Sequence, residues 1–135
     1  MGRVVHFEIP AEDPDRAAEF YRKSFGWDVV GWGGPARYLL VTTGPADEVG
    51  INGAITDRHE HLQSVVNSID VDGWERAAAA ISSAGGEVLT AKTAINGIGY
   101  FSYCRDTEGN VFGILETDPA ATVSGAPVAA GRATG

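Results

Sequence analysis

The chain has 135 residues, a formal net charge of −8 at pH 7 and a sequence pI near 4.7, a length that suits one domain. This acidic balance supplies no basic cluster for a phosphate backbone, so we expect no nucleic-acid partner. A single cysteine, Cys104, excludes an intrachain disulfide and favours a cytoplasmic location. The sequence holds no signal-like N-terminus and no run of ~20 apolar residues, so we expect neither secretion nor a membrane partner.

The first predicted element is a strand over residues 4–9. Its alternation places His6 and Glu8 on one face and apolar residues on the other. A helix follows from Pro14 to near Phe25. Its start is marked by a capping aspartate before the proline, and its end by Gly26. Phe20, Tyr21 and Phe25 have the spacing of a buried helical stripe.

Three more strands are predicted before residue 56. Two of them, "WDVVGWG" and "RYLLVTTG", are separated by a turn at residues 33–35, and the third is "GINGAI". A polar stretch, "TDRHEHLQS", then reads as a linker. Its His59 and His61 would share a strand face, but a solvated linker is the favoured interpretation.

The second half of the chain repeats the first at an offset of 60 residues. Val5, Ile9, Arg16, Ala17, Ala18, Gly26 and Gly53 recur as Val65, Ile69, Arg76, Ala77, Ala78, Gly86 and Gly113. The second copy predicts a helix in "DGWERAAAAISSAGG" with Asp72 as N-cap, and strands in "EVLT", "YFSYCRD" and "NVFGIL". Each copy therefore has the order strand, helix, strand, strand, strand, which indicates one duplicated supersecondary unit.

These elements predict an α+β fold. Two βαβββ modules, residues 3–57 and 63–117, would form one domain over residues 1–117, in a pseudo-two-fold arrangement with a curved sheet around a cup. Residues 118–135 are small and aperiodic, which predicts a flexible tail.

The paired units, with "HFEIPAEDPDRAAEFYRKSFGW" in the first and "DTEGNVFGILE" closing the second, resemble the vicinal oxygen chelate superfamily. This is the group of glyoxalase I, bleomycin-resistance proteins and extradiol dioxygenases. More narrowly, "WGGPARYLLVTTGPADEVGINGAI" and "INGIGYFSYCRDTEGNVFGILETD" look like a bacterial glyoxalase-like branch. The resemblance implies a homodimer and a cup for a small molecule. It leaves the function open, because the superfamily includes isomerases, dioxygenases, epimerases, thiol transferases and non-catalytic drug-binding proteins.

In metal-dependent members of that superfamily, four positions on the first and last strands of the two units hold a divalent ion. By the repeat, these positions here are His6, Gly53, Val66 and Gly113. Only His6 carries a donor side chain, so we predict no metal and no other cofactor. An atypical divalent ion held by His6, Glu8 and Asp70 is the alternative.

Strand parity assigns residues to the two faces of each predicted sheet. The inward set is His6, Glu8, Ile51, Gly53, Ile55, Val66, Ser68, Val111, Gly113 and Leu115. The set beneath the helices is Phe7, Ile9, Ala54, Ile69, Phe112 and Ile114. Trp27, Trp32, Tyr38, Tyr100 and Tyr103 are expected at the rim. From these sets we predict ligand-binding roles for Trp32, Tyr38, Ile51, Gly53, Ser68, Tyr100, Tyr103 and Gly113.

Two classes of function remain open at this point. In one, the apolar cup binds a small organic metabolite or a drug-like molecule. In the other, the protein is a lyase or isomerase acting on a small carbonyl or oxygenated substrate. His6 and Glu8 are the candidate catalytic pair, which would serve as general base and partner in proton abstraction next to a carbonyl.

Overall fold

The computed structural model describes residues 2–31 and 37–122, which contain nine strands and two helices. Contacts divide these residues into two compact units, one of residues 5–67 and one of residues 2–4 with 68–122. The predicted α+β class and the two βαβββ modules are confirmed.

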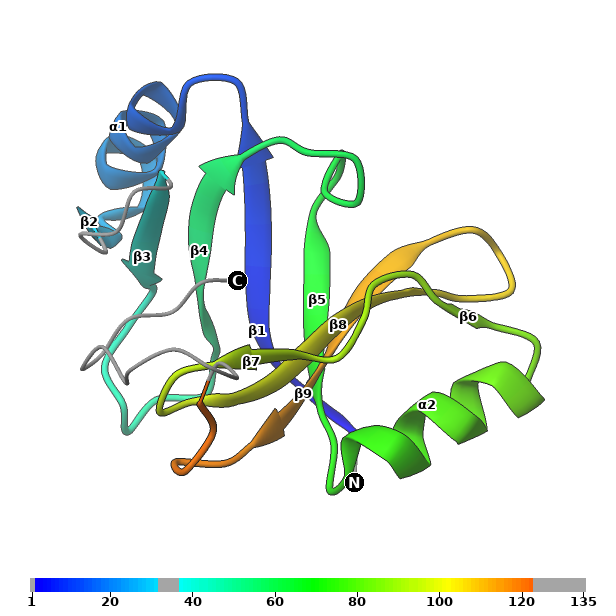
Figure 1. Ribbon diagram of the computed structural model, residues 1–135. Helices are drawn as coiled ribbons and strands as arrows, with labels where there is room; N and C mark the ends of the chain where they lie inside the picture. The colour runs from blue at the N-terminus through cyan, green and yellow to red at the C-terminus, as the bar shows by residue number, and fades with distance from the viewer. Residues whose placement is uncertain (1, 32–36, 123–135) are drawn as a thin grey trace. The chain divides into compact units, whose positions relative to one another are not determined.

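The first module is a four-stranded sheet with one helix. Its strands have the order β2-β3-β4-β1, in which β1 and β4 run parallel and the other neighbours antiparallel. Its elements are β1 (Arg3–Ala11), α1 (Pro14–Phe25), β2 (Asp28–Gly31), β3 (Tyr38–Thr42) and β4 (Asn52–Asp57). Helix α1 lies against one face of this sheet (Figure 1). We call the opposite face the far face.

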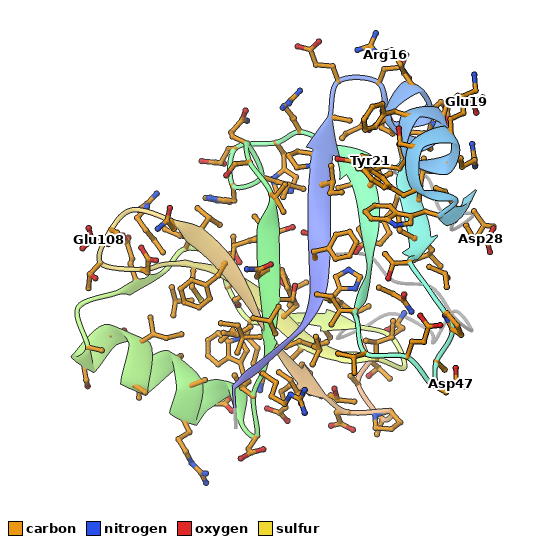
Figure 2. All side chains as sticks on the ribbon, turned by 180° about the vertical axis from the view of Figure 1, so that it is seen from behind. Arg16, Glu19, Tyr21, Asp28, Asp47 and Glu108 are labelled. Atoms are coloured by element: carbon orange, nitrogen blue, oxygen red, sulfur yellow. The ribbon has the colours of Figure 1, made fainter. Side chains whose placement is uncertain are left out.

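Helix α1 begins and ends where its sequence predicts. The side chain of Asp13 accepts a hydrogen bond from the backbone N–H of Arg16 at 3.0 Å, Pro14 occupies the first turn, and Gly26 ends the helix in the left-handed conformation with φ 71°. In Figure 2, Arg16 and Glu19 project away from the strands, whereas Tyr21 points toward them.

The core beneath α1 is built from small and aliphatic side chains. Its buried members are Ala11, Ala18, Val29, Leu39, Val41 and Ile55, with Phe7, Ile9, Ala17, Tyr21 and Trp27 packed against them. The predicted buried stripe is therefore wrong in part. Phe20 and Phe25 are 57% and 64% exposed. Tyr21 is the member of the predicted stripe that packs against the core, near the buried Ala18. Trp27, expected at the rim, stacks on Tyr21 with ring centroids 4.7 Å apart.

The second module has the same element order plus one short strand. Its strands have the order β5-β9-β8-β6, with β7 paired to β8. The elements are β5 (Val66–Asp70), α2 (Trp74–Ser83), β6 (Glu87–Val88), β7 (Thr93–Ile95), β8 (Gly99–Arg105) and β9 (Val111–Thr117). The turn before β9 is held by Asp106, whose side chain accepts hydrogen bonds from the backbone N–H groups of Glu108 and Asn110.

The start of α2 differs from its prediction. Gly73, not Asp72, is the N-cap residue, and it offers no capping side chain. The carboxylate of Glu116 on β9 accepts the backbone N–H of Trp74 at 2.7 Å instead. The ring N–H of Trp74 donates to the hydroxyl of Ser102 at 3.0 Å, so the first residue of α2 is fixed to two strands.

Ordered packing continues past the predicted start of the tail. The N–H of Asp118 donates to the carbonyl of Ile98, and the carbonyl of Ala121 accepts from the N–H of Gly97. Ala121 itself is buried. In the described part of the chain, no helix is long and apolar enough to cross a membrane.

Candidate functional site

Two polar side chains lie next to each other on the far face of the first module. His6 and Glu8 alternate along β1 with Phe7 and Ile9, which pack into the core under α1. This is the face that the sequence predicts for the pair. Glu8 is only 6% exposed, whereas His6 is half-buried.

Tyr38 joins these two residues into one hydrogen-bonded chain. Its hydroxyl donates to Oε2 of Glu8 at 3.0 Å and lies 3.1 Å from Nε2 of His6. Tyr38 was expected at a ligand-binding rim, but the structure places its polar atom against the candidate catalytic pair. The site thus consists of a carboxylate, a phenol and an imidazole, contributed by β1 and β3.

The tyrosine reaches β1 across an intervening strand. β4 lies between β3 and β1, and in register Leu40 pairs with Ala54, which in turn pairs with Glu8. Ala54 is fully buried and lies on the far face, in register with Glu8. Its side chain is a single methyl group, which leaves room for Tyr38 to reach Glu8 across β4. Strand parity predicts Ala54 on the helix side, so this contact was not predicted from the sequence.

The proton positions follow from the donor inventory of each group. Tyr38 has one hydroxyl proton, which it donates to Glu8. The contact with His6 therefore requires that Nε2 of His6 carries a proton and donates it to the tyrosine oxygen. Burial lowers the pKa of His6 below 6.5, and the neighbouring Glu8 opposes this only in part. At neutral pH the imidazole is accordingly uncharged.

The second module carries a related arrangement without acid–base groups. Ser68 pairs in register with Gly113, and Gly113 with Tyr103. The ring of Phe101 covers Gly113, since a Cβ built there would lie 2.6 Å from it and 3.2 Å from the hydroxyl of Ser68. Ser68 and Tyr103 are buried on this face, which is opposite the one that meets α2.

The predicted face of β4 is wrong. Phe7 pairs with Gly53, and Ile55 belongs to the core under α1, so both β4 residues lie on the helix side. A strand slipped by one residue relative to its expected register turns every side chain to the other face. Gly53 contributes no ligand space there, because a Cβ at this position would lie 2.5 Å from the ring of Phe7.

Other predicted ligand-binding positions also differ from expectation. Gly113 leaves no open volume, because the ring of Phe101 fills it. Tyr100 lies on the same face of β8 as Ser102, toward α2, where Lys92 sits 4.4 Å from its ring centroid. Ile51 precedes β4, and its carbonyl accepts the hydroxyl of Thr43. Trp32 and the predicted turn at 33–35 lie outside the described residues.

The donor set can be tested against a divalent metal. Of the four positions that the repeat equates with a metal site, Gly53 is on the helix side, Val66 is a buried aliphatic residue and Gly113 is covered by a ring. Over residues 2–31 and 37–122, no group of three His, Cys, Asp or Glu side chains could hold a metal ion. These residues do not fit the ion, so we derive no step through a metal.

Comparison with known proteins identifies the family. Residues 3–114 match the family model described as the Glyoxalase/Bleomycin resistance protein/Dioxygenase superfamily. A glyoxylase-like domain-containing protein of Didymella fabae is 30% identical over 118 residues, covering 84% of this chain and 92% of that protein. The chain therefore belongs to this superfamily, as its resemblance implied.

Solved structures with the same fold have low sequence identity to this chain. A methylmalonyl-CoA epimerase in complex with methylmalonyl-CoA and NH4+ matches with a TM-score of 0.64 and 17% identity, covering 90% of this chain and 99% of that one. A Streptomyces coelicolor methylmalonyl-CoA epimerase variant in complex with 2-nitronate-propionyl-CoA matches with a TM-score of 0.63 and 17% identity, covering 89% and 97%. At this identity the likeness establishes the fold alone.

Proposed function

From its place in this superfamily and the geometry of its first module, we propose that the protein is an isomerase-type or lyase-type enzyme. It binds a small organic molecule against the far face and moves a proton next to a carbonyl group. Glu8 acts as the general base. The observation that carries this proposal is the buried carboxylate of Glu8, hydrogen-bonded to Tyr38, which in turn contacts His6.

The chemistry of the site favours proton abstraction. The carboxylate of Glu8 is buried on the far face, so little water competes with a substrate for its oxygens. The hydroxyl of Tyr38 gives the anion a donor, and the neutral His6 adds no positive charge to the chain. A carbonyl beside the reacting carbon is required, because it stabilises the negative charge left after the proton is taken.

The solved relatives suggest where to look for a substrate. Those named methylmalonyl-CoA epimerases are in complex with methylmalonyl-CoA or with 2-nitronate-propionyl-CoA. Methylmalonyl-CoA carries an acidic C–H next to its thioester carbonyl. We use such compounds as probes for this chain rather than as its assigned substrates. A suitable panel is methylmalonyl-CoA, propionyl-CoA, pyruvate and dihydroxyacetone.

The test is exchange of a substrate proton for solvent deuterium. The protein is incubated with each probe in D2O, and the loss of the C–H signal is followed by proton NMR. We expect exchange of at least one probe, slowed about 100-fold or more in Glu8→Gln, since a positioned general base contributes roughly 10²–10⁴-fold. Glu12→Gln, a change at an exposed carboxylate directly after β1, is the matched control and should exchange normally. Absence of exchange in the wild type, or full exchange in Glu8→Gln, would refute the proposal.

A ligand-sequestering protein is the second candidate function. It is supported by the far face of the second module, where Phe101 and Tyr103 pair edge to face at 4.8 Å beside the buried Ser68. Such a surface suits a flat or apolar compound. Stabilisation of the protein by a ligand in thermal unfolding, with the compound recovered unchanged, would favour this function over catalysis.

We further propose a cytoplasmic homodimer. The location is supported by the single thiol, Cys104, which is buried and whose pKa burial raises to about 11, as expected of an inert structural cysteine. Sedimentation velocity of the purified protein tests the oligomeric state.

A further inference from the structure

We propose that His6 selects the substrate through its Nδ1 atom, which accepts a hydrogen bond from a hydroxyl group of the ligand. The substrate class is then a neutral carbonyl compound that carries a hydroxyl group, rather than a carboxylate or a phosphate. This inference rests on the proposed function, because it names the substrate class of the same site. It gives His6 a role in recognition that involves no transfer of a proton.

The hydrogen bonds of the site run in one direction, from His6 to Tyr38 and from Tyr38 to Glu8. Nε2 of His6 lies 3.1 Å from the tyrosine oxygen, and the tyrosine hydroxyl donates to Oε2 of Glu8 at 3.0 Å. Because the phenol has one proton and shares it with Glu8, the proton between His6 and Tyr38 belongs to Nε2. Burial lowers the pKa of His6, so the imidazole is neutral at pH 7 and carries this one ring proton. Nδ1 is therefore an acceptor.

Nδ1 of His6 is accessible to a ligand. With the described residues, His6 makes its hydrogen bond through Nε2. Over residues 2–31 and 37–122, no side-chain nitrogen or oxygen of an unexposed residue is buried without a hydrogen-bond partner. Since Nδ1 has no partner among these residues, it is not buried. His6 is half-buried on the far face, so Nδ1 is a polar atom that this face presents to solvent.

The direction of the hydrogen bonds decides which ligands these three groups can recognise. The Nε2 proton of His6 and the hydroxyl proton of Tyr38 are both used within the site, so the groups present acceptor atoms to a ligand. A carboxylate or phosphate needs donors and gains no hydrogen bond here. A hydroxyl group can donate to Nδ1. Glu8 follows two residues along the same face, roughly 7 Å away at Cα, a spacing that a short hydroxy ketone can span. Of the exchange probes, dihydroxyacetone has this chemistry.

The second module shows that the fold does not itself require an imidazole at this position. Val66 lies two residues before Ser68 on β5, as His6 lies two residues before Glu8 on β1. Val66 is a buried aliphatic residue. The position can therefore be filled by packing alone, and an acceptor is present only in the module that carries the carboxylate.

The first measurement concerns the protein without a ligand. At pH 7.5, long-range 15N–1H NMR should show Nε2 of His6 protonated and Nδ1 without a proton. Tyr38→Phe removes the oxygen that accepts the Nε2 proton and should weaken this preference. Tyr21→Phe, which removes a hydroxyl on the helix side, is the matched control and should leave the His6 signals unchanged. A proton on Nδ1 in the wild type would overturn the proposal, because Nδ1 would then be a donor.

The second measurement compares three ligands that share a ketone group. Hydroxyacetone carries a hydroxyl donor, methoxyacetone keeps the oxygen without its proton, and acetone has neither. In NMR titrations of the wild type, we expect hydroxyacetone to bind about 3–10-fold more tightly than the other two, which is the usual contribution of one hydrogen bond. Hydroxyacetone alone should move the Nδ1 resonance of His6. If it binds no more tightly than methoxyacetone, or leaves Nδ1 unmoved, the proposal is wrong.

A substitution at His6 tests the same preference from the side of the protein. His6→Phe removes the acceptor and should bind the three ligands with similar affinity. His61→Phe, a change at a half-buried histidine of the linker, is the matched control and should keep the preference for hydroxyacetone. A preference that persists in His6→Phe would overturn the proposal. The Nδ1 shift in the wild type decides the matter if His6→Phe does not fold.

Glu8→Gln separates recognition from the proposed function. Its amide carbonyl can still accept the Tyr38 hydroxyl, so this variant should lose deuterium exchange and retain the preference for hydroxyacetone. If the wild type shows the preference but exchanges no probe, the proposed base is wrong and recognition by His6 stands. If exchange depends on Glu8 but hydroxyacetone gains nothing over methoxyacetone, the base is right and recognition by His6 is wrong.

Discussion

Glu8 and Ser68 occupy the same place in their modules. Each lies on the first strand and pairs in register with a small residue of the last strand, Ala54 or Gly113. Both are buried, yet only Glu8 carries a chargeable group. Burial of a carboxylate is costly unless donors satisfy it, so the first module bears a cost that the second avoids. A buried carboxylate in only one of the two modules indicates that the proposed chemistry, rather than folding, requires Glu8.

His6 should make stability depend on pH. Burial lowers its pKa in the folded chain below 6.5, so between these two pKa values the unfolded chain binds more protons. The contribution of His6 to stability is therefore complete above pH 6.5 and is lost as the pH falls through its folded pKa. NMR titration should find the lowered pKa directly. Urea unfolding at pH 7.5 and 5.5 should show a smaller loss in His6→Asn than in the wild type, and equal losses would contradict the assignment.

The residues of the site were only partly accessible from sequence. Alternation along β1 correctly placed His6 and Glu8 on the face away from the core, because that strand has no irregularity. The hydrogen bond from Tyr38 to Glu8 could not be predicted, because it crosses the intervening strand β4 and depends on the small side chain of Ala54. An alanine in a strand gives no signal of its own in a sequence.

At the scale of elements, helix ends that are marked by local capping residues were predictable, whereas strand registers were not. α1 carries its own N-cap, proline and terminating glycine, and its predicted ends were right. The face of β4 was predicted from the repeat with no gap. In the structure Gly113 pairs with Ser68, whereas Gly53 pairs with Phe7 rather than with Glu8. The modules therefore differ by one residue in register, and a repeat of residue types does not reveal so small a slip.

The start of α2 should depend on a residue from another strand. None of its ten residues is fully buried, and its N-terminus is fixed by the carboxylate of Glu116, which accepts a hydrogen bond from the backbone N–H of Trp74. Removing that acceptor in Glu116→Ala should lower the free energy of unfolding by about 1–2 kcal/mol, measured by urea denaturation. Glu116→Gln keeps an acceptor oxygen and should recover most of the loss.

A matched control for this cap is Glu87→Ala. Glu87 is also a strand glutamate of the second module, but its contact is an exposed ion pair with Arg105. Such a pair contributes at most about 1 kcal/mol. If Glu116→Ala cost no more than Glu87→Ala, the cap would have no special importance for α2.

At the scale of the whole molecule, the duplication fixed the fold but not the site. Two βαβββ modules follow from periodicity and turn signals that each copy carries locally. The proposed function depends instead on which module carries acid–base side chains on its far face. Only the side-chain contacts of the structure identify the first module as that one. Phe20 and Phe25 are a further example, since helical spacing predicted their burial and both are exposed, whereas Ala18 and Tyr21 of the same helix face the core.

The donor chemistry of both modules predicts weak binding of divalent ions. First-row metal sites normally need three protein ligands, and the first module offers His6 and Glu8, both already engaged with Tyr38. The second offers the hydroxyl of Ser68 at the equivalent place, which is a poor ligand. Calorimetric titration of metal-free protein with Ni, Zn, Mn and Fe(II) should therefore find no site tighter than micromolar affinity.

The linker supplies the control for that titration. The rings of His59 and His61 lie 6.5 Å apart and could bind an ion weakly without any relation to the proposed site. Any heat of metal binding that the wild type shows and the His59→Ala, His61→Ala double variant lacks is due to these two histidines. Heat that disappears only in His6→Ala would come from the site itself. A stoichiometric, tight response of that kind would replace the metal-free proposal with one in which Glu8 and His6 are metal ligands.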